Sequence, residues 1–153
     1  MLKFWVIVIF VLVLDQGSKL VVQRLLDPGL SVPVAGEILR LTYVLNPGGA
    51  FGILGDRPHI LLGVGLLALV LALAVLPRII RVGYTWPAGL LFGGALGNLI
   101  DRVRFGRVID FIDLGFWPVF NLADTAIVAG SILLALLVLR RDKDQRGEQH
   151  GHP

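Results

Sequence analysis

Residues 60–76 read ILLGVGLLALVLALAVL and contain no charged or strongly polar side chain. A helix needs roughly 20 mostly apolar residues to cross the bilayer, so this stretch predicts a transmembrane helix. The composition agrees: of the 153 residues 56% are hydrophobic and 16% are charged, whereas a soluble domain has about 25% charged residues. A soluble protein of this length could not bury so much apolar surface in one core. We therefore predict an integral membrane protein.

Three further apolar stretches flank this one. They cover residues 4–22, about 82–100 and about 116–139. We predict an all-α polytopic membrane protein with four transmembrane helices in one domain, residues 1–139. The third span is expected to stop at Asp101. The polar tail, residues 140–153, is expected to be disordered.

The first apolar stretch resembles a cleaved signal peptide, because Lys3 precedes it. No small-x-small cleavage site follows, and Asp15 and Gln16 stand where the cleavage region would lie. We therefore expect this stretch to remain as the first transmembrane helix.

The basic residues indicate the topology. Arg78 and Arg81 lie in a short link without an acid, and Lys3 and the basic tail lie at the two ends of the chain. Cytoplasmic loops are enriched in Lys and Arg, which places both termini and the 77–84 link in the cytoplasm. Lys and Arg are equally numerous on the two sides in this arrangement. The net charge of +3 is thus read as a sign of topology, and no nucleic-acid partner is expected.

The extracytoplasmic segment between the first two helices, about 26–58, is predicted to contain a small β element. Residues 39–43 alternate between apolar and polar side chains, and residues 30–34 form a second short run before a turn. This period of two predicts a hairpin-like element that lies on the membrane. The shorter outer segment, residues 102–115, is expected to be a solvated loop that includes Asp110 and Asp113.

Polar residues at the outer ends of the third and fourth spans suggest chemistry. A charge at the centre of a membrane helix costs about 2.5–3.5 kcal/mol on insertion scales. The third span runs outward and the fourth returns, so Asp101 and Asp124 share one face of the membrane. Asn98 and Asn121 each precede an aspartate by three residues, which places an amide beside a carboxyl on one side of a helix.

Two carboxyl groups at close range share one proton and titrate as a unit. The ionised member can take a proton from water while the protonated member polarises a carbonyl group. Such a pair suits amide hydrolysis without a metal or a covalent intermediate. In the third span Gly89, Gly93 and Gly97 recur at every fourth position, with Gly94 beside them, and small residues at this spacing allow close helix packing.

Other classes of site find less support. The chain has no cysteine and no H-E-x-x-H motif, so we expect no metal and no cofactor. The alternative function is a small four-span proton-coupled transporter, which also needs a membrane carboxylate. A transporter would place one acid near the midplane, whereas here two acids lie at one end. The enzyme is therefore preferred.

Five motifs in this order resemble the lipoprotein signal peptidases (type II signal peptidases) of bacteria, over residues 4 to 139. They are Asp15-Gln16-x-x-Lys19, Asn46-Pro47-Gly48-Gly49-Ala50-Phe51-Gly52, Gly93-Gly94-Ala95-Leu96-Gly97-Asn98-Leu99-Ile100-Asp101-Arg102, Val108-Ile109-Asp110-Phe111-Ile112-Asp113 and Phe120-Asn121-Leu122-Ala123-Asp124. Relatives commonly show Asn-Thr-Gly-Ala-Ala-Phe in the second motif, where this chain has Pro47 and Gly49.

The resemblance implies an aspartic endopeptidase of the bacterial cytoplasmic membrane, with Asp101 and Asp124 as its catalytic pair near the extracytoplasmic face. Its substrates would be diacylglyceryl-modified prolipoproteins, cut just before the lipidated cysteine, and globomycin would inhibit it. The resemblance implies that further residues line or brace the site or contribute to it. These residues are Asn98, Arg102, Asn121, Ala123, Asp15, Gln16, Lys19, Asn46 and Gly48.

Several roles stay open at this point. Arg102 is either an interfacial anchor or the ion-pair partner of a site carboxylate. Asp15 and Lys19 either neutralise each other or contact the substrate. Phe51, Phe116 and Trp117 are placed for interfacial anchoring. The β element over residues 30–44 would hold an extended substrate by its backbone. Membrane lipid is the expected environment, and a bundle with an internal site is expected to act as a monomer.

Overall fold

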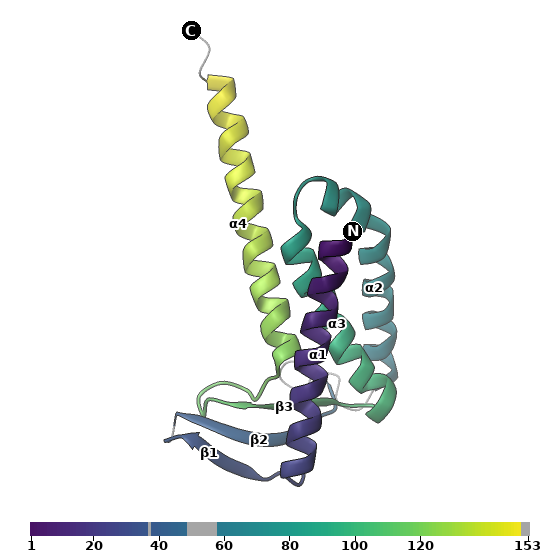
Figure 1. Cartoon of the computed structure of the whole chain (residues 1–153), viewed down its shortest axis with the longest axis vertical. Coiled ribbons are helices and arrows are strands. Elements are labelled where there is room, and N and C mark those ends of the chain that lie inside the picture. The colour runs from purple at the N-terminus through teal and green to yellow at the C-terminus, as the bar shows by residue number, and fades with distance from the viewer. Residues whose placement is uncertain (37, 49–57, 151–153) are drawn as a thin grey trace.

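The computed structural model describes residues 1–36, 38–48 and 58–150. In this part of the chain four helices stand on a three-stranded sheet (Figure 1). The elements in chain order are α1 (Leu2–Leu25), β1 (Ser31–Ala35), β2 (Leu39–Asn46), α2 (Pro58–Arg81), α3 (Thr85–Phe105), β3 (Val108–Asp113) and α4 (Leu122–His150).

Three of the helices, α1, α2 and α4, are long and apolar enough to cross a membrane. The prediction of transmembrane helices is confirmed for these three. Helix α3 covers the predicted third span, but its C-terminal half carries Asn98, Asp101 and two arginines. It packs against each of the other three helices (Figure 1). Because these helices surround α3, its side chains meet protein more than lipid, and its sequence does not need the hydropathy of its neighbours.

The small residues of α3 let two helices approach it closely, as predicted. A Cβ atom on Gly93 would lie 2.8 Å from Cβ of Val11 in α1. A Cβ atom on Gly94 would collide with the backbone carbonyl of Ala123 in α4. Of these two adjacent glycines, Gly93 therefore allows close packing of α1 and Gly94 allows close packing of α4.

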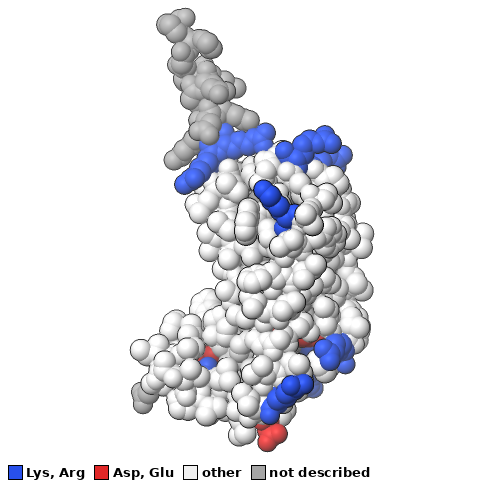
Figure 2. Space-filling model, in the orientation of Figure 1, with Lys and Arg blue, Asp and Glu red and all other residues white. Residues whose placement is uncertain are grey.

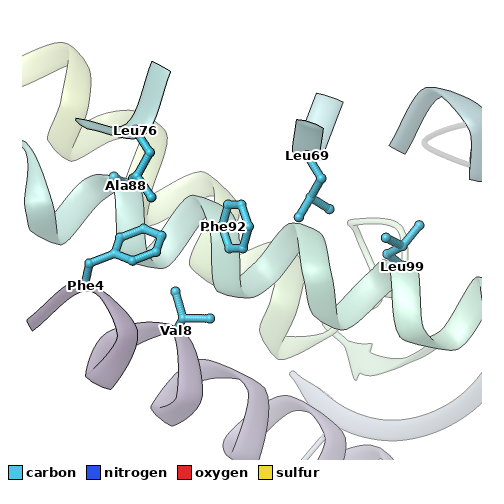
Figure 3. Close-up of a cluster of buried hydrophobic side chains, with 7 residues drawn as sticks. All are labelled: Phe4, Val8, Leu69, Leu76, Ala88, Phe92 and Leu99. Carbon is cyan, nitrogen blue, oxygen red and sulfur yellow. The ribbon is translucent and has the colours of Figure 1, made fainter. Parts of the chain in front are cut away.

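An apolar cluster joins α1, α2 and α3 in the membrane (Figure 3). The rings of Phe4 and Phe92 meet edge to face, with centroids 5.5 Å apart. Leu69 and Leu76 of α2 reach the same cluster. Outside it, α1, α2 and α4 expose many large apolar side chains. On the face shown in Figure 2 the charged residues gather towards the two ends and leave an uncharged band between them, as expected of a surface that meets lipid.

The sheet has the order β1-β2-β3 and is antiparallel throughout. The β1–β2 hairpin confirms the predicted β element. The third strand corrects the prediction of a solvated loop, because residues 108–113 pair with β2. The alternation of VIDFID turns Ile109 and Phe111 towards Val22 of α1 and Tyr43 of β2. This apolar cluster fixes the sheet to the C-terminal end of α1.

The helix ends differ from the prediction in three places. Helix α3 does not stop at Asp101 but continues to Phe105, where Gly106 adopts a left-handed conformation with φ of 69°. Helix α4 begins at Leu122, so residues 116–121 precede it. Helix α4 also continues to His150, so residues 140–150 are helical rather than disordered. This stretch is rich in Arg, Lys, Gln and Glu, which favour helix.

We expect Gly94→Ala to destabilise the bundle by about 1–3 kcal/mol, because the added methyl group meets backbone of α4 that cannot move aside. Thermal unfolding of the purified protein in detergent measures the effect. Gly63→Ala in α2 is the control, since nothing lies within 4 Å of a Cβ atom there. Equal melting temperatures for the two variants would contradict the close α3–α4 contact.

Candidate active site

A buried lysine lies at the centre of the polar residues between α1 and α3. The Lys19 ammonium is 2.8 Å from Oδ2 of Asp15 and 2.7 Å from Oδ2 of Asp101. It also donates to Oδ1 of Asn98 at 3.3 Å. The three N–H groups of the ammonium thus have three acceptors. Asp15 and Lys19 form an ion pair, which was one of the two alternatives considered from the sequence. Asp101 forms a second ion pair with Lys19.

The carboxyl group of Asp101 is fully engaged by donors. Besides Lys19 it accepts from Gln16 Nε2 at 2.9 Å and from the backbone N–H of Ile109 at 3.1 Å. Its side chain is 1% exposed. These three contacts leave the carboxyl group little room for a further partner. Asp101 therefore ties the end of α3 to α1 and to the start of β3.

Asp15 makes the corresponding link to α4. Its Oδ1 accepts from the backbone N–H of Ala123 at 3.0 Å. Ala123 lies in the first turn of α4, where backbone N–H groups lack partners within the helix and a negative charge is favoured. A Cβ atom on Gly97 would lie 2.6 Å from Oδ2 of Asp15, so the carboxylate needs a glycine at this point of α3.

Asn121 and Asp124 form a reciprocal cap on α4. The backbone N–H of Asp124 donates to Oδ1 of Asn121 at 2.8 Å, and the backbone N–H of Asn121 donates to Oδ2 of Asp124 at 3.3 Å. This is the arrangement of a capping box. Asn121 therefore lies before the helix, which corrects the prediction that the two residues share one side of a helix.

The side-chain amides of Asn98 and Asn121 do not bind the carboxyl groups that were predicted, which were Asp101 for Asn98 and Asp124 for Asn121. Asn98 Nδ2 donates to Oδ1 of Asp124 at 2.7 Å. Asn121 Nδ2 donates to Oδ1 of Asp110 at 2.7 Å, and to Oδ1 of Asn98 at 3.1 Å. Neither amide donates to Asp101. The two amides thus link Asp110 on β3 with Asp124 on α4.

Asp110 is buried, which corrects the prediction of a solvated position. It is 2% exposed. Its Oδ2 accepts from Asn46 Nδ2 at 2.8 Å, and Oδ1 of Asn46 accepts in turn from the backbone N–H of Gly48 at 3.1 Å. The turn at Asn46 and Gly48 therefore orients the amide that binds Asp110. Asp113, at the other end of β3, is not buried and accepts from Thr42 Oγ1 at 2.7 Å.

A cavity of about 290 Å³ opens between the sheet and the ends of α3 and α4. Its lining residues are Asn46, Asn98, Arg102, Val108, Asp110, Trp117, Pro118, Val119, Phe120 and Asp124. Asp110 and Asp124 both line this cavity, whereas Asp101 does not. Four of the other residues singled out from the sequence do not line the cavity: Asp15, Gln16, Lys19 and Ala123. Phe51 lies outside the described residues.

The surroundings of Asp110 shift its proton affinity. Burial is the main cause that raises the pKa of Asp110, and the charge of Asp124 adds to it, while the amides of Asn46 and Asn121 and the charge of Lys19 lower it; together these effects bring the pKa to about 6. Below this pH the buried carboxyl holds a proton, and above it the cavity contains two neighbouring carboxylates. Among the described residues no group of three His, Cys, Asp or Glu side chains is placed to hold a metal ion.

Comparisons with known proteins show similarity over most of the chain. The family model of signal peptidase (SPase) II matches residues 7–140. The lipoprotein signal peptidase of Moorella thermoacetica is 45% identical over 144 residues, which cover 90% of this chain and 93% of that protein. That of Pelotomaculum thermopropionicum is 43% identical over 150 residues, covering 95% and 97%. A bacterial membrane enzyme solved by the in meso method at 2.3 Å resolution superposes with a TM-score of 0.87 at 30% identity, covering 94% of this chain and 92% of that one.

We expect Lys19→Met to lower the stability of the protein by about 3–5 kcal/mol, because Asp15 and Asp101 would remain buried without a counter-ion. Thermal unfolding in detergent measures this loss. Lys3→Met is the matched control, since Lys3 is exposed at the end of α1. A Lys19 variant as stable as the Lys3 variant would show that the buried charges are solvated by other means.

We expect Asp110 to titrate near pH 6, because burial disfavours its charged form. The measurement is ¹³C NMR of aspartate-labelled protein in detergent, followed over pH. The signal should vanish in Asp110→Asn, and its midpoint should fall in Asp124→Asn, because that variant removes a neighbouring negative charge. A midpoint near the ordinary aspartate value would contradict the burial of this carboxyl group in solution.

Proposed function

The chain belongs to the signal peptidase II family of lipoprotein signal peptidases, and from this membership we propose that Asp110 and Asp124 carry out its peptide hydrolysis. Family membership makes the protein an aspartic-type peptidase that acts on prolipoproteins. The observation that supports this pair is the shared cavity, which both carboxyl groups line and which Asp101 does not reach.

The proposal replaces Asp101, the catalytic residue expected from the sequence, by Asp110. Asp101 is closed off by Lys19, Gln16 and the backbone of Ile109. Asp101 is thus the partner of a buried ammonium and does not line the cavity in which a substrate could meet it. Asp110 and Asp124 have amide partners instead, which orient them without supplying a full counter-charge.

In the proposed reaction Asp110 begins protonated and Asp124 begins ionised. Asp124 takes a proton from a water molecule, whose oxygen attacks the scissile carbonyl carbon while Asp110 donates a hydrogen bond to the carbonyl oxygen. Asp124 then returns the proton to the leaving amide nitrogen as the carbon–nitrogen bond breaks. The raised pKa of Asp110 supports its assignment as the residue that holds the proton.

The buried cluster of Asp15, Gln16, Lys19 and Asp101 positions the reacting pair in this proposal. Asp101 holds the start of β3, which carries Asp110, through Ile109. Asp15 holds the start of α4, which carries Asp124, through Ala123. Arg102 lines the cavity beside both carboxyl groups and is placed to bind a substrate carbonyl group.

We propose that the substrate is a diacylglyceryl-modified prolipoprotein, cut just before its lipidated cysteine, and that globomycin inhibits the enzyme by occupying the cavity. Strand β2 forms one side of that cavity through Asn46, which supports the proposal that the sheet holds extended substrate. The transporter alternative is not favoured, because the comparisons point to a peptidase.

In the proposed membrane arrangement all four helices span the bilayer, α3 being shielded by the other three. Both termini and the α2–α3 link face the cytoplasm, and the sheet and cavity face outward. Arg78 and Arg81 at the end of α2 and Arg140 and Arg141 in α4 support this orientation. The protein acts as a monomer in this proposal, since every proposed catalytic group comes from one chain.

We expect purified protein in detergent to cleave a diacylglyceryl-modified prolipoprotein, and Asp110→Asn and Asp124→Asn each to lower kcat/KM by about 10³-fold or more. Both variants should keep their melting temperatures, because each removes one of two neighbouring carboxylates. Asp113→Asn, on the same strand but outside the cavity, is the control and should stay active.

The variant Asp101→Asn distinguishes the proposed catalytic pair, Asp110 and Asp124, from the pair expected from the sequence, Asp101 and Asp124. We expect this variant to lose thermal stability, because Lys19 loses one of its two carboxylate partners. Wild-type cleavage by Asp110→Asn would refute the proposed pair and return the catalytic role to Asp101.

A further inference from the structure

A second hollow lies on α4, beneath the segment of residues 114–120 that precedes the helix. Its volume is about 460 Å³. One wall consists of Thr125, Val128, Ala129 and Ile132, whose spacing of three and four residues places them on one face of the helix. At 1.5 Å per residue this wall runs for about 10 Å along α4. The hollow is thus a groove that follows the helix away from its N-terminus.

The groove faces away from the helix bundle. The opposite face of α4 packs on α3, since a Cβ atom on Gly94 would meet Ala123 and Ile127, and one on Gly130 would meet Leu91. Val128 and Ile132 are 57% and 55% exposed. The other wall includes Phe116 and Trp117 from the segment before the helix, which are also exposed. The groove therefore opens towards lipid rather than into the protein.

The groove joins the catalytic cavity end to end. Asp124, Trp117 and Phe120 line both of them. Beyond Asp124 the lining offers little to a polar ligand, because the hydroxyl group of Thr125 already donates to the backbone carbonyl of Asn121 at 3.0 Å. A ligand of the groove would thus be apolar, with its polar end beside Asp124.

We propose that this groove binds an acyl chain of the substrate's diacylglyceryl group, an inference that rests on the proposed function. The lipid is attached to the side chain of the cysteine whose amide nitrogen leaves in the reaction. Its glyceryl group therefore begins only a few bonds from the leaving nitrogen, to which Asp124 returns the proton. The acyl chain has to leave the catalytic cavity along an apolar route, and the groove provides one that starts at Asp124.

Chain-length dependence tests this proposal. We compare kcat/KM for two prolipoprotein substrates, one with dipalmitoylglyceryl and one with dihexanoylglyceryl cysteine, in wild type and Ala129→Trp. The indole fills the groove, so the ratio of kcat/KM for the long-chain to the short-chain substrate should fall about tenfold. Ala135→Trp, on the same helix and outside the groove, is the matched control and should leave the ratio unchanged.

Each other outcome has a definite meaning. An equal loss for both substrates would overturn the proposal, because the groove would then bind the peptide or the substitution would distort the catalytic cavity. No loss for either substrate would also overturn it, leaving the groove as ordinary contact with bulk lipid. A wild type that cleaves neither substrate would refute the proposed function instead.

A second measurement does not depend on the folding of Ala129→Trp. Asp110→Asn, which keeps the groove intact, is mixed with a substrate that carries a diazirine in its acyl chain and is then irradiated. Crosslinks should map by mass spectrometry to residues 114–132. Crosslinks to α2 instead would place the acyl chain on another face of the bundle and overturn the proposal.

Discussion

The ammonium group of Lys19 is the interaction on which the rest of the structure depends. A charge buried within a membrane protein is costly unless it is paired, and Lys19 is paired twice, with Asp15 of its own helix and with Asp101 of α3. Each carboxylate then binds the backbone of a further element. Asp15 accepts from Ala123 in α4, and Asp101 accepts from Ile109 in β3. One cation thus connects three helices and the sheet.

This arrangement divides the four acidic side chains around the site into two kinds. The two that neutralise Lys19, Asp15 and Asp101, are buried against it and do not line the cavity. The other two, Asp110 and Asp124, are bound by the amides of Asn46, Asn98 and Asn121. An amide satisfies a carboxylate oxygen without cancelling its charge, so the repulsion between these two carboxyl groups persists. Burial and this repulsion raise the pKa of Asp110 to about 6, which makes it able to hold a proton near neutral pH.

Much of the fold follows from local sequence. Hydropathy predicts the helices, glycine spacing predicts the close packing of α3, and alternation predicts the β1–β2 hairpin. The site is less accessible to such reasoning. An Asn-x-x-Asp spacing occurs both within a helix and in a capping box, so it does not tell the two apart. The apolar residues 116–120 placed the start of the fourth span before Leu122, where α4 begins. The alternation in residues 108–113 is visible, but the strand pairs with β2 more than 60 positions earlier in the chain, and nothing local indicates that partner.

The choice between Asp101 and Asp110 shows the limit of motif reasoning most clearly. Both lie in motifs of the family, and which of them Lys19 reaches depends on how α1 packs against α3. Strand geometry then decides the place of Asp110: Ile109 and Phe111 turn inward against Val22, so the residue between them must face the other side of the sheet. A slip of one residue would bury Asp110 in the apolar cluster. Asn121 completes the arrangement, because it caps α4 beside Asp124 and also donates to Asp110. The relative position of the two carboxyl groups is therefore fixed by one side chain that belongs to neither of them.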